Sequence, residues 1–280
     1  MNAMPEKLGL IAGRGAYPLL LAESAKKQGV RHLFAIAFRG ETARGIGRLA
    51  DSVAWLRVGQ LQAMLDAIRD SAVPGVVMAG QIAPRNLFSV RPDARMLGLL
   101  RRLDRWNAHT IFGAIGDELR AIGVELLPAS SFMEAAMPAP GTIGGREPTE
   151  GELADIRFGI AVARSVSALE IGQTVVVKQG VVLAVEAFEG TDETLLRAGR
   201  LGGPGAVAVK VAKRGHDMRF DIPVVGERTF RMLRRIRAGA LAVEAGRTIL
   251  LEREKLVKTA GRIGLAFVAT RVEHDGIEKG

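Results

Sequence analysis

The first 130 residues alternate short apolar runs with stretches of helical spacing. The apolar runs are 8–12, 33–38, 52–58, 75–79 and 124–127. Between two of them, residues 60–72 carry apolar side chains at positions 61, 64, 65 and 68, which lie on one face of a helix. Strands that read as continuously apolar and are separated by helices are typical of a parallel sheet with helices on both faces. We therefore expect a doubly wound α/β domain over residues 1–128.

The second half of the chain has a different pattern. Residues 129–151 are rich in proline and glycine, which indicates a linker or an ordered loop between domains. A helix is expected over 152–169, then a hairpin that turns at Gln179 and Gly180, and then further strands and helices. We predict an α/β chain with two domains: an N-terminal Rossmann-like domain (1–128) and a mixed α+β domain (152–280).

The composition excludes several classes of protein. The chain has no cysteine, so disulfides and thiolate metal sites are excluded. No apolar run reaches the roughly 18 residues of a spanning helix, and the first residues lack a signal-peptide layout, so a cytoplasmic location is expected. The net charge of +9 fits an arginine-rich surface or an attraction to phosphates. Few aromatic residues and no recognition module argue against nucleic acid.

A glycine turn follows the first apolar run. Gly13, Arg14 and Gly15 connect that run to a helix that starts near Pro18. Backbone N–H groups at the start of a helix suit a phosphate. However, Pro18 stands where a dinucleotide fingerprint has its third glycine, and the second strand ends on Arg39 rather than on an acid. The turn is therefore a candidate phosphate site, with a purely structural turn as the alternative.

A second turn with polar side chains follows the run at 75–79. It carries Gln81 and Arg85. Ligands of open α/β sheets bind at the carboxyl ends of the strands, so both turns are expected on the same edge of the sheet. A structural turn is again the alternative.

Acidic residues gather in the second half. Glu186, Glu189 and Asp192 occur at and beyond the end of a strand. Carboxylates at such a place suit a hard divalent cation such as Mg²⁺ or acid–base chemistry. Helix capping by Thr191 or Asp192 is the alternative.

A second acidic group is Asp217 and Asp221, with Arg219 between them. If this stretch is extended, the three side chains share one face. An ion pair between Asp217 and Arg219 is the alternative to a site.

Several longer blocks resemble one known family, the LpxI family of UDP-2,3-diacylglucosamine pyrophosphatases of lipid A biosynthesis. The similar blocks are residues 8–18, 171–177, 184–192, 211–223 and 244–247. The resemblance implies a two-domain cytoplasmic enzyme, peripheral to the inner membrane, that uses Mg²⁺ to hydrolyse UDP-2,3-diacylglucosamine to UMP and 2,3-diacylglucosamine 1-phosphate (lipid X). It also implies that sugar and acyl chains lie between the domains, and a homodimer is considered as well.

Together, the resemblance and the patterns above give a set of candidate site residues. The catalytic candidates are Asp221, Asp192 and Asp217, and the metal candidates are Asp221, Asp192 and Glu189. The substrate-binding candidates are Gly13, Arg14, Gly15, Gln81, Arg85, Gln173, Glu189, Gly190, Thr191, Lys213 and Arg219.

The sequence departs from the family in two places. Members often carry Gly-Asp-Asp where this chain has residues 106–110, and Lys-Pro-Gly-Gln where it has residues 213–216. These changes put a role for acids in the first segment in doubt. A non-catalytic sugar-nucleotide or lipid binding protein and a dinucleotide-dependent oxidoreductase remain as alternative functions.

Overall fold

The computed structural model describes residues 5–82, 92–212, 219–220 and 222–272. The chain forms two compact units. Unit 1 comprises Met1–Glu134 with Asp217–Asp221, and unit 2 comprises Ala135–His216 with Ile222–Gly280.

Unit 1 is built on a parallel sheet with the strand order β3-β2-β1-β4-β5. The strands are β1 (Lys7–Ala12), β2 (His32–Phe38), β3 (Ser52–Leu56), β4 (Gly75–Ala79) and β5 (Glu125–Leu126). The helices are α1 (Tyr17–Lys27), α2 (Leu61–Asp70), α4 (Ala94–Arg101) and α5 (Ala108–Ala121). The α/β class expected for this half is confirmed.

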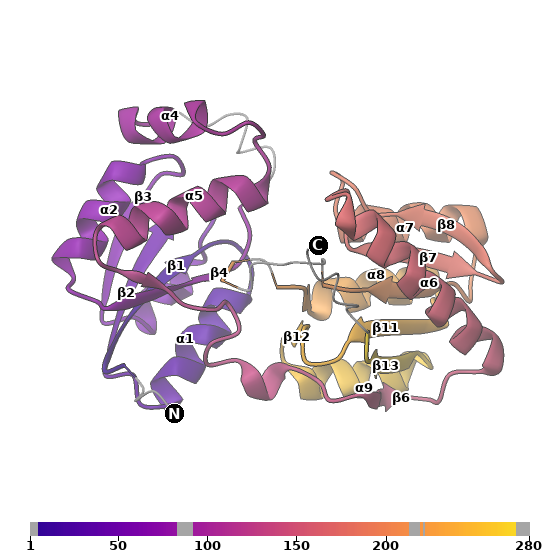
Figure 1. Ribbon diagram of the computed structural model, residues 1–280. Helices are drawn as coiled ribbons and strands as arrows, with labels where there is room; N and C mark the ends of the chain where they lie inside the picture. The colour runs from indigo at the N-terminus through magenta and orange to yellow at the C-terminus, as the bar shows by residue number, and fades with distance from the viewer. Residues whose placement is uncertain (1–4, 83–91, 213–218, 221, 273–280) are drawn as a thin grey trace, which may run out of the picture. The chain divides into compact units, whose positions relative to one another are not determined.

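The helices of unit 1 cover both faces of the sheet, α1 on one and α2, α4 and α5 on the other (Figure 1). On the second face, Ile11, Ile36 and Met78 of the sheet share a buried core with Leu65 of α2 and Leu119 of α5. The strands are apolar on both faces because helices pack on both.

Unit 1 continues past the boundary at residue 128 that the sequence suggests. The Tyr17 hydroxyl of α1 donates to the Ala129 carbonyl, and burial raises the pKa of Tyr17, with a smaller contribution from the charge of Glu134. Ser24 and Gln28 of the same helix both donate to the Phe132 carbonyl. These bonds hold the beginning of the expected linker against α1.

Unit 2 is built on a mixed sheet with the strand order β6-β13-β11-β9-β7-β8. The strands are β6 (Gly141–Gly145), β7 (Thr174–Lys178), β8 (Val181–Val185), β9 (Val207–Lys210), β11 (Ala240–Glu244) and β13 (Ala266–Thr270). Its three middle strands β9, β11 and β13 are parallel, whereas β6 and β7 pair antiparallel with them. A separate parallel pair is formed by β10 (Val224–Val225) and β12 (Ile249–Leu250).

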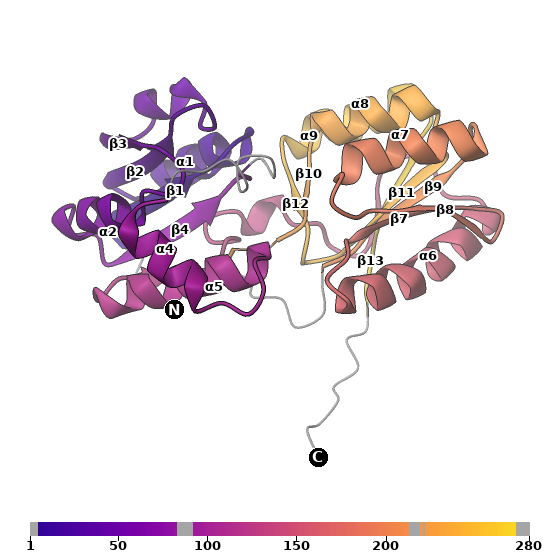
Figure 2. The same cartoon turned by 90° about the horizontal axis from the view of Figure 1, so that it is seen from above.

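Helices again cover both faces of this sheet (Figure 2). They are α6 (Glu150–Ala168), α7 (Thr191–Gly202), α8 (Glu227–Ile236) and α9 (Arg253–Ile263). Ile156 of α6 packs with Val175 and Val209 on one face, while Leu195 of α7 packs with Val176 and Ala208 on the other. The alternation along β7 and β9 thus separates two cores.

The segment 129–151, expected as a linker or loop, contains the strand β6, which pairs with β13. A Cβ at Gly144 would lie 2.9 Å from a Val257 methyl, and one at Gly145 would lie 1.8 Å from the Leu265 carbonyl oxygen. Gly144 and Gly145, which the sequence suggests as part of a linker, therefore allow β6 to lie close to α9 and to the chain before β13.

Among the residues that the structure describes, no helix combines the length and the apolar character needed to cross a membrane.

The helices α4 and α5 of unit 1 are joined by an ion cluster around Glu118. Arg95 Nη2 donates to Glu118 Oε2 at 2.6 Å, and Arg102 Nη2 donates to Oε1 at 2.9 Å. The hydrogen bond from Arg95 is the main cause that holds the pKa of Glu118 below its usual value, against the opposing effect of burial. Only 13% of the Glu118 side chain is exposed, so water screens this cluster less than a surface pair.

We expect Glu118→Gln to lower the free energy of unfolding at pH 7 by about 1–2 kcal/mol, because charge-assisted hydrogen bonds are lost. The pKa of Glu118 is lower in the folded than in the unfolded state, so its stabilisation is complete above about pH 4.3 and is lost as the pH falls through the folded pKa. Denaturant unfolding should therefore show a difference in the free energy of unfolding between the wild type and Glu118→Gln that is smaller at about pH 3 than at pH 7. Glu125→Gln, at an exposed position on β5, is the control. A difference that is constant with pH would contradict this account.

Candidate functional site

The carboxyl ends of β1 and β4 form the switch point of the unit 1 sheet. The chain proceeds from β1 to β2 on one side, whereas β4 lies on the other side of β1. Crevices at such a point are where open α/β sheets bind ligands. The glycine turn after β1 and the turn with Gln81 after β4 both lie here, as the sequence predicts.

The two turns contact each other directly through their backbones. The Gly13 amide donates to the Ala79 carbonyl at 2.7 Å, and the Arg14 amide donates to the Gln81 carbonyl at 2.7 Å. A Cβ on Gly13 would lie 2.7 Å from the Gln81 carbonyl oxygen, and one on Gly80, whose φ is +91°, would lie 2.7 Å from the Arg14 carbonyl oxygen. The expectation that the whole turn has free amides is therefore wrong for Gly13 and Arg14.

The free amides of this turn lie one step further along. Among the described residues, the amides of Gly15, Ala16 and Tyr17 have no hydrogen-bond partner. Gly15 is exposed, its φ is +99°, and nothing lies within 4 Å of a Cβ built there. These groups are at the N-terminus of α1, where the helix dipole favours an anion.

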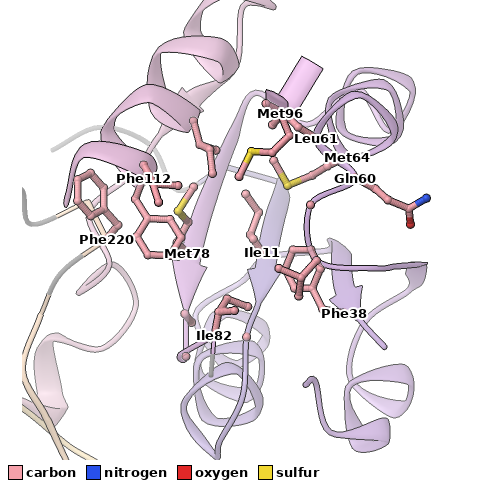
Figure 3. A pocket seen from close by; sticks show the side chains of 17 residues that line it. Ile11, Phe38, Gln60, Leu61, Met64, Met78, Ile82, Met96, Phe112 and Phe220 are labelled. Carbon is pink, nitrogen blue, oxygen red and sulfur yellow. The ribbon is translucent and has the colours of Figure 1, made fainter. Parts of the chain in front are cut away.

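An apolar pocket opens beside this turn, and all of it belongs to unit 1 (Figure 3). Its lining joins Ile11, Met78 and Phe38 at the strand ends to side chains of α2, α4 and α5. Figure 3 shows the labelled apolar side chains directed into a common space, while the Gln60 amide points away from it. The pocket holds about 800 Å³ of space that no atom fills, its open mouth included. It can take an apolar group but provides few polar partners.

One wall of the pocket comes from a distant part of the sequence. Phe220 lies against Phe112 of α5, with 5.9 Å between ring centroids, and against His109, at 5.7 Å. Phe220 and Arg219 lie in a turn. For these two residues this corrects the extended run expected here, while Asp217 and Asp221 lie outside the described residues. Arg219 instead lies near Gly116 of α5.

Unit 2 gathers polar side chains at one edge of its sheet. Lys210 and Glu244 are the last residues of the neighbouring parallel strands β9 and β11. Thr174 begins the antiparallel strand β7 opposite Lys210, and Glu186 follows β8. All four are less than 9% exposed. The topology thus collects buried polar side chains at one edge of the sheet.

Two of these polar side chains, Lys210 and Glu186, are joined through Thr191 in a chain of hydrogen bonds. Lys210 Nζ donates to Thr191 Oγ1 at 2.9 Å, and Thr191 Oγ1 donates to Glu186 Oε1 at 2.8 Å. Thr191 is the first residue of α7 and follows Gly190, whose φ is +82°. Glu186 Oε2 is buried and has no partner among the described residues. A buried acceptor without a donor costs about 1–3 kcal/mol.

Glu189 and Asp192, the two other acids that the sequence places beyond the end of β8, are paired with arginines. Arg197 Nη2 donates to Glu189 Oε1 at 2.5 Å, and Arg228 forms an ion pair with Asp192. Burial opposes the charge of Glu189, but hydrogen bonds from the backbone and from Arg197 outweigh it and lower its pKa. Within the described ranges, no three acidic or histidine side chains form a group that could hold a metal. In this structure Glu189 and Asp192 are therefore each paired with an arginine.

Two further residues of the resembling blocks lie at this edge. The Gln173 carbonyl accepts from the Val211 amide at 3.0 Å, while its side-chain Oε1 is buried without a partner among the described residues. Glu244 Oε2 accepts from the Ala212 amide at 2.8 Å, and its Oε1 lies 3.4 Å from Arg247 Nε. Glu244 thereby holds the chain directly after β9.

Some candidates cannot be placed. Arg85, Lys213, Asp217 and Asp221 lie outside the described residues. The structure adds Lys210, which the sequence analysis missed although a lysine at the end of the apolar run 206–210 is a visible signal. At the family departure near residue 107, the Asn107 side chain accepts from the Thr110 amide and caps α5, a structural use of that position.

Comparisons with known proteins agree with this division of the chain. The model of the LpxI N-terminal domain matches residues 7–136, and that of the LpxI C-terminal domain matches residues 139–268. A curated relative, UDP-2,3-diacylglucosamine pyrophosphatase LpxI of Caulobacter vibrioides, is 32% identical over 270 residues, which are 92% of this chain and 95% of that protein.

Two solved structures with a related arrangement are distant from this chain. The biotin carboxylase domain of the Hydrogenobacter thermophilus 2-oxoglutarate carboxylase has a TM-score of 0.30 at 13% identity, over 71% of this chain and 41% of that chain. The Campylobacter jejuni biotin carboxylase has a TM-score of 0.28 at 10% identity, over 72% of this chain and 43% of that chain. This chain thus spans less than half the length of these structures, and at such scores they carry no argument. Both halves match in sequence, however, and the chain belongs to the LpxI family.

Proposed function

We propose that this protein hydrolyses the pyrophosphate bond of UDP-2,3-diacylglucosamine and releases UMP and 2,3-diacylglucosamine 1-phosphate. The family membership and the name of the curated relative support the reaction class and the substrate. The structural observation that supports it best is that Gly13 lines the apolar pocket, while the amides of residues 15–17, directly after it in the same turn, have no partner among the described residues. A substrate with a pyrophosphate and two acyl chains needs both kinds of contact.

The turn after β1 is our candidate for the phosphate contact. The amides of Gly15 and Ala16 can donate to a phosphate oxygen, and the exposed Arg14 adds a positive charge. These groups are held in place by the backbone bonds of Gly13 and Arg14 to the turn after β4. Preorganised donors of this kind bind an anion without having to be rearranged.

The apolar pocket is our candidate for an acyl chain. Its lining is formed by aliphatic, methionine and phenylalanine side chains, with Gln60 as the one polar side chain among the 17 lining residues. Burial of methylene groups there contributes about 0.8 kcal/mol each. Methionines suit chains of varying shape because their side chains adapt.

We further propose Mg²⁺ as the cofactor and Asp221 as the essential carboxylate. The cofactor is proposed from substrate chemistry: Mg²⁺ binds phosphate oxygens with one or two carboxylates and waters, and when bound it neutralises charge on the phosphoryl group. Since Glu189 and Asp192 are paired with arginines, we assign no step to a metal held by them.

A peripheral position at the cytoplasmic face of the inner membrane completes the proposal. Trp106 is 62% exposed and Leu97 is 41% exposed. Both lie in or just after α4, where Arg101 and Arg105 are exposed as well. Exposed tryptophan next to arginine suits the interface of an anionic membrane, from which a lipid substrate would be taken.

We expect Gly15→Ala to lower the catalytic efficiency on UDP-2,3-diacylglucosamine at least tenfold, because a side chain would crowd the phosphate and strain the turn. Gly29→Ala is the matched control: its φ is +103°, nothing lies within 4 Å of a Cβ there, and it lies on the opposite edge, before β2. Both changes should cost about 1–2 kcal/mol of stability through the positive φ. Equal losses of activity in the two variants would refute a phosphate contact at Gly15.

We expect Met96→Gln to raise the KM for a long-chain substrate about tenfold and to leave that for a short-chain, water-soluble analogue nearly unchanged. The substitution preserves the side-chain length but adds a polar amide to the pocket wall. Met232→Gln, at another half-buried methionine on a helix but in unit 2, controls for lost stability. If KM for both substrates rises in parallel, the pocket does not take an acyl chain.

We expect Asp221→Ala to reduce turnover about a hundredfold or more, the usual scale for an acid–base group, with the melting temperature nearly unchanged. UMP release is the measurement, with Asp70→Ala, at an exposed position of α2, as the control. Treatment with EDTA should abolish UMP release by the wild type, and Mg²⁺ should restore it. Full activity in EDTA would exclude the cofactor, and near-wild-type turnover of Asp221→Ala would exclude the carboxylate.

A further inference from the structure

The lysine at the end of β9 is buried in a way that needs an explanation. Lys210 is 6% exposed, and lysines are almost never this buried unless their ammonium group is paired. Its hydrogen bond among the described residues goes to the neutral hydroxyl of Thr191 rather than to a carboxylate. The nearest acid of the network, Glu186, bonds to the same hydroxyl from the other side.

The Thr191 hydroxyl therefore lies between a cationic donor and an acidic acceptor. It accepts one hydrogen bond and donates the other, so the hydrogen-bond direction and the side-chain rotamer are both determined. Thr174 Oγ1 lies 3.5 Å from the same oxygen and contacts the Thr191 hydroxyl from a third side. Thr174 is 1% exposed and its carbonyl accepts the Glu186 amide, so this frame belongs to the sheet itself.

Thr191 begins α7 directly after Gly190, in a helix start that no side chain caps. Among the described residues, the amides of Thr191 and Asp192 have no partner. With no cap, the direction of this turn depends on other contacts. The Lys210–Thr191–Glu186 bonds tie it to β9 and to the end of β8, and the Gly190 amide donates to the Ala187 carbonyl at 3.3 Å.

We propose that Lys210 and Glu186 are positioning residues, which hold the Thr191 hydroxyl between them and so set the geometry of the Gly190–Thr191 turn for the substrate. The assignment of this turn to the substrate rests on the proposed function. Lys210 acts through Thr191 and does not touch the substrate itself.

The chain supplies a matched control at the other end of the same helix. Lys178, at the end of β7, donates through Nζ to the Gly202 carbonyl at the C-terminal end of α7 at 2.6 Å. Lys178→Met and Lys210→Met therefore each remove one lysine bond between the sheet and α7. Only the second removes it at the Gly190–Thr191 turn.

The first test is kinetic. Lys210→Met and Thr191→Val should each lower kcat/KM on UDP-2,3-diacylglucosamine at least tenfold, whereas Lys178→Met should stay within about threefold of the wild type. Thr191→Ser, which keeps the hydroxyl, should lose less than Thr191→Val. Because Lys210 acts through Thr191, the variant with both Lys210→Met and Thr191→Val should have a kcat/KM no lower than that of the less active single variant. If the two losses multiply, Lys210 acts on the substrate independently and the positioning role is overturned.

The second test needs no substrate. Hydrogen exchange of the Gly190 and Thr194 amides, which donate to the Ala187 and Gly190 carbonyls, should be faster in Lys210→Met and in Thr191→Val than in the wild type and in Thr191→Ser. In Lys178→Met the faster exchange should lie near residue 202 instead. Unchanged exchange of the Gly190 and Thr194 amides in both Lys210→Met and Thr191→Val would overturn the inference. If Lys210→Met does not fold, the Thr191 pair decides alone.

The two tests separate this inference from the function on which it rests. A wild type that fails to release UMP from the substrate refutes the proposed function, while the exchange experiment still decides whether Lys210 positions the turn. A wild type that is active, with Lys210→Met equally active, refutes the inference and leaves the proposed function intact.

Discussion

The contact between the backbones of Gly13 and Gln81 is the constraint on which the N-terminal site depends. Two turns after neighbouring parallel strands normally diverge, but here they are bonded to each other at 2.7 Å. Only glycine at position 13 permits this approach, since any Cβ would overlap the opposite backbone. The contact closes the edge of the sheet between β1 and β4. It also directs the chain into α1, where the amides of Gly15 and Ala16 have no partner among the described residues, and it places Gly13 and Gly80 of the two turns along the rim of the apolar pocket.

The two units meet different physical demands at the carboxyl edges of their sheets. In unit 1 the edge leads into an apolar pocket. Covering the apolar lining of this pocket removes it from water, which lowers the free energy. In unit 2 the edge gathers buried polar groups, and these must find partners. Lys210, Thr191 and Glu186 do so among themselves, yet Glu186 Oε2 and Gln173 Oε1 are left without a donor among the described residues. Each incompletely satisfied group of this kind needs an explanation, and a role in binding or catalysis is one of them.

The sequence predicts the units more reliably than it predicts their sites. Strands such as β1 and β4 were predictable because they are apolar on both faces and end at glycine. By contrast, β11, in the middle of the unit 2 sheet, is hard to predict because its alanines have a low strand propensity and its pairing with β9 and β13 makes it a strand. The glycines of β6 indicate a linker in the sequence, because their close contacts with Val257 and Leu265 come from distant parts of the chain. The pairing of Glu189 and Asp192 with arginines was likewise not predictable, since Arg197 and Arg228 lie on different helices and spacing along the chain does not reveal such contacts.

The position of Phe220 in the pocket has a consequence for the order in which the protein is made. The unit 1 sheet is complete once residue 126 has been synthesised, and it can fold as a domain while the rest of the chain is still on the ribosome. At that stage the pocket lacks its Phe220 wall, because nearly a hundred further residues separate that side chain from β5. Unit 2 in turn cannot pair β6 until β13, near the end of the chain, has emerged. A nascent chain stalled between these points would expose an unfinished apolar pocket together with an unpaired strand, the surfaces on which chaperones act.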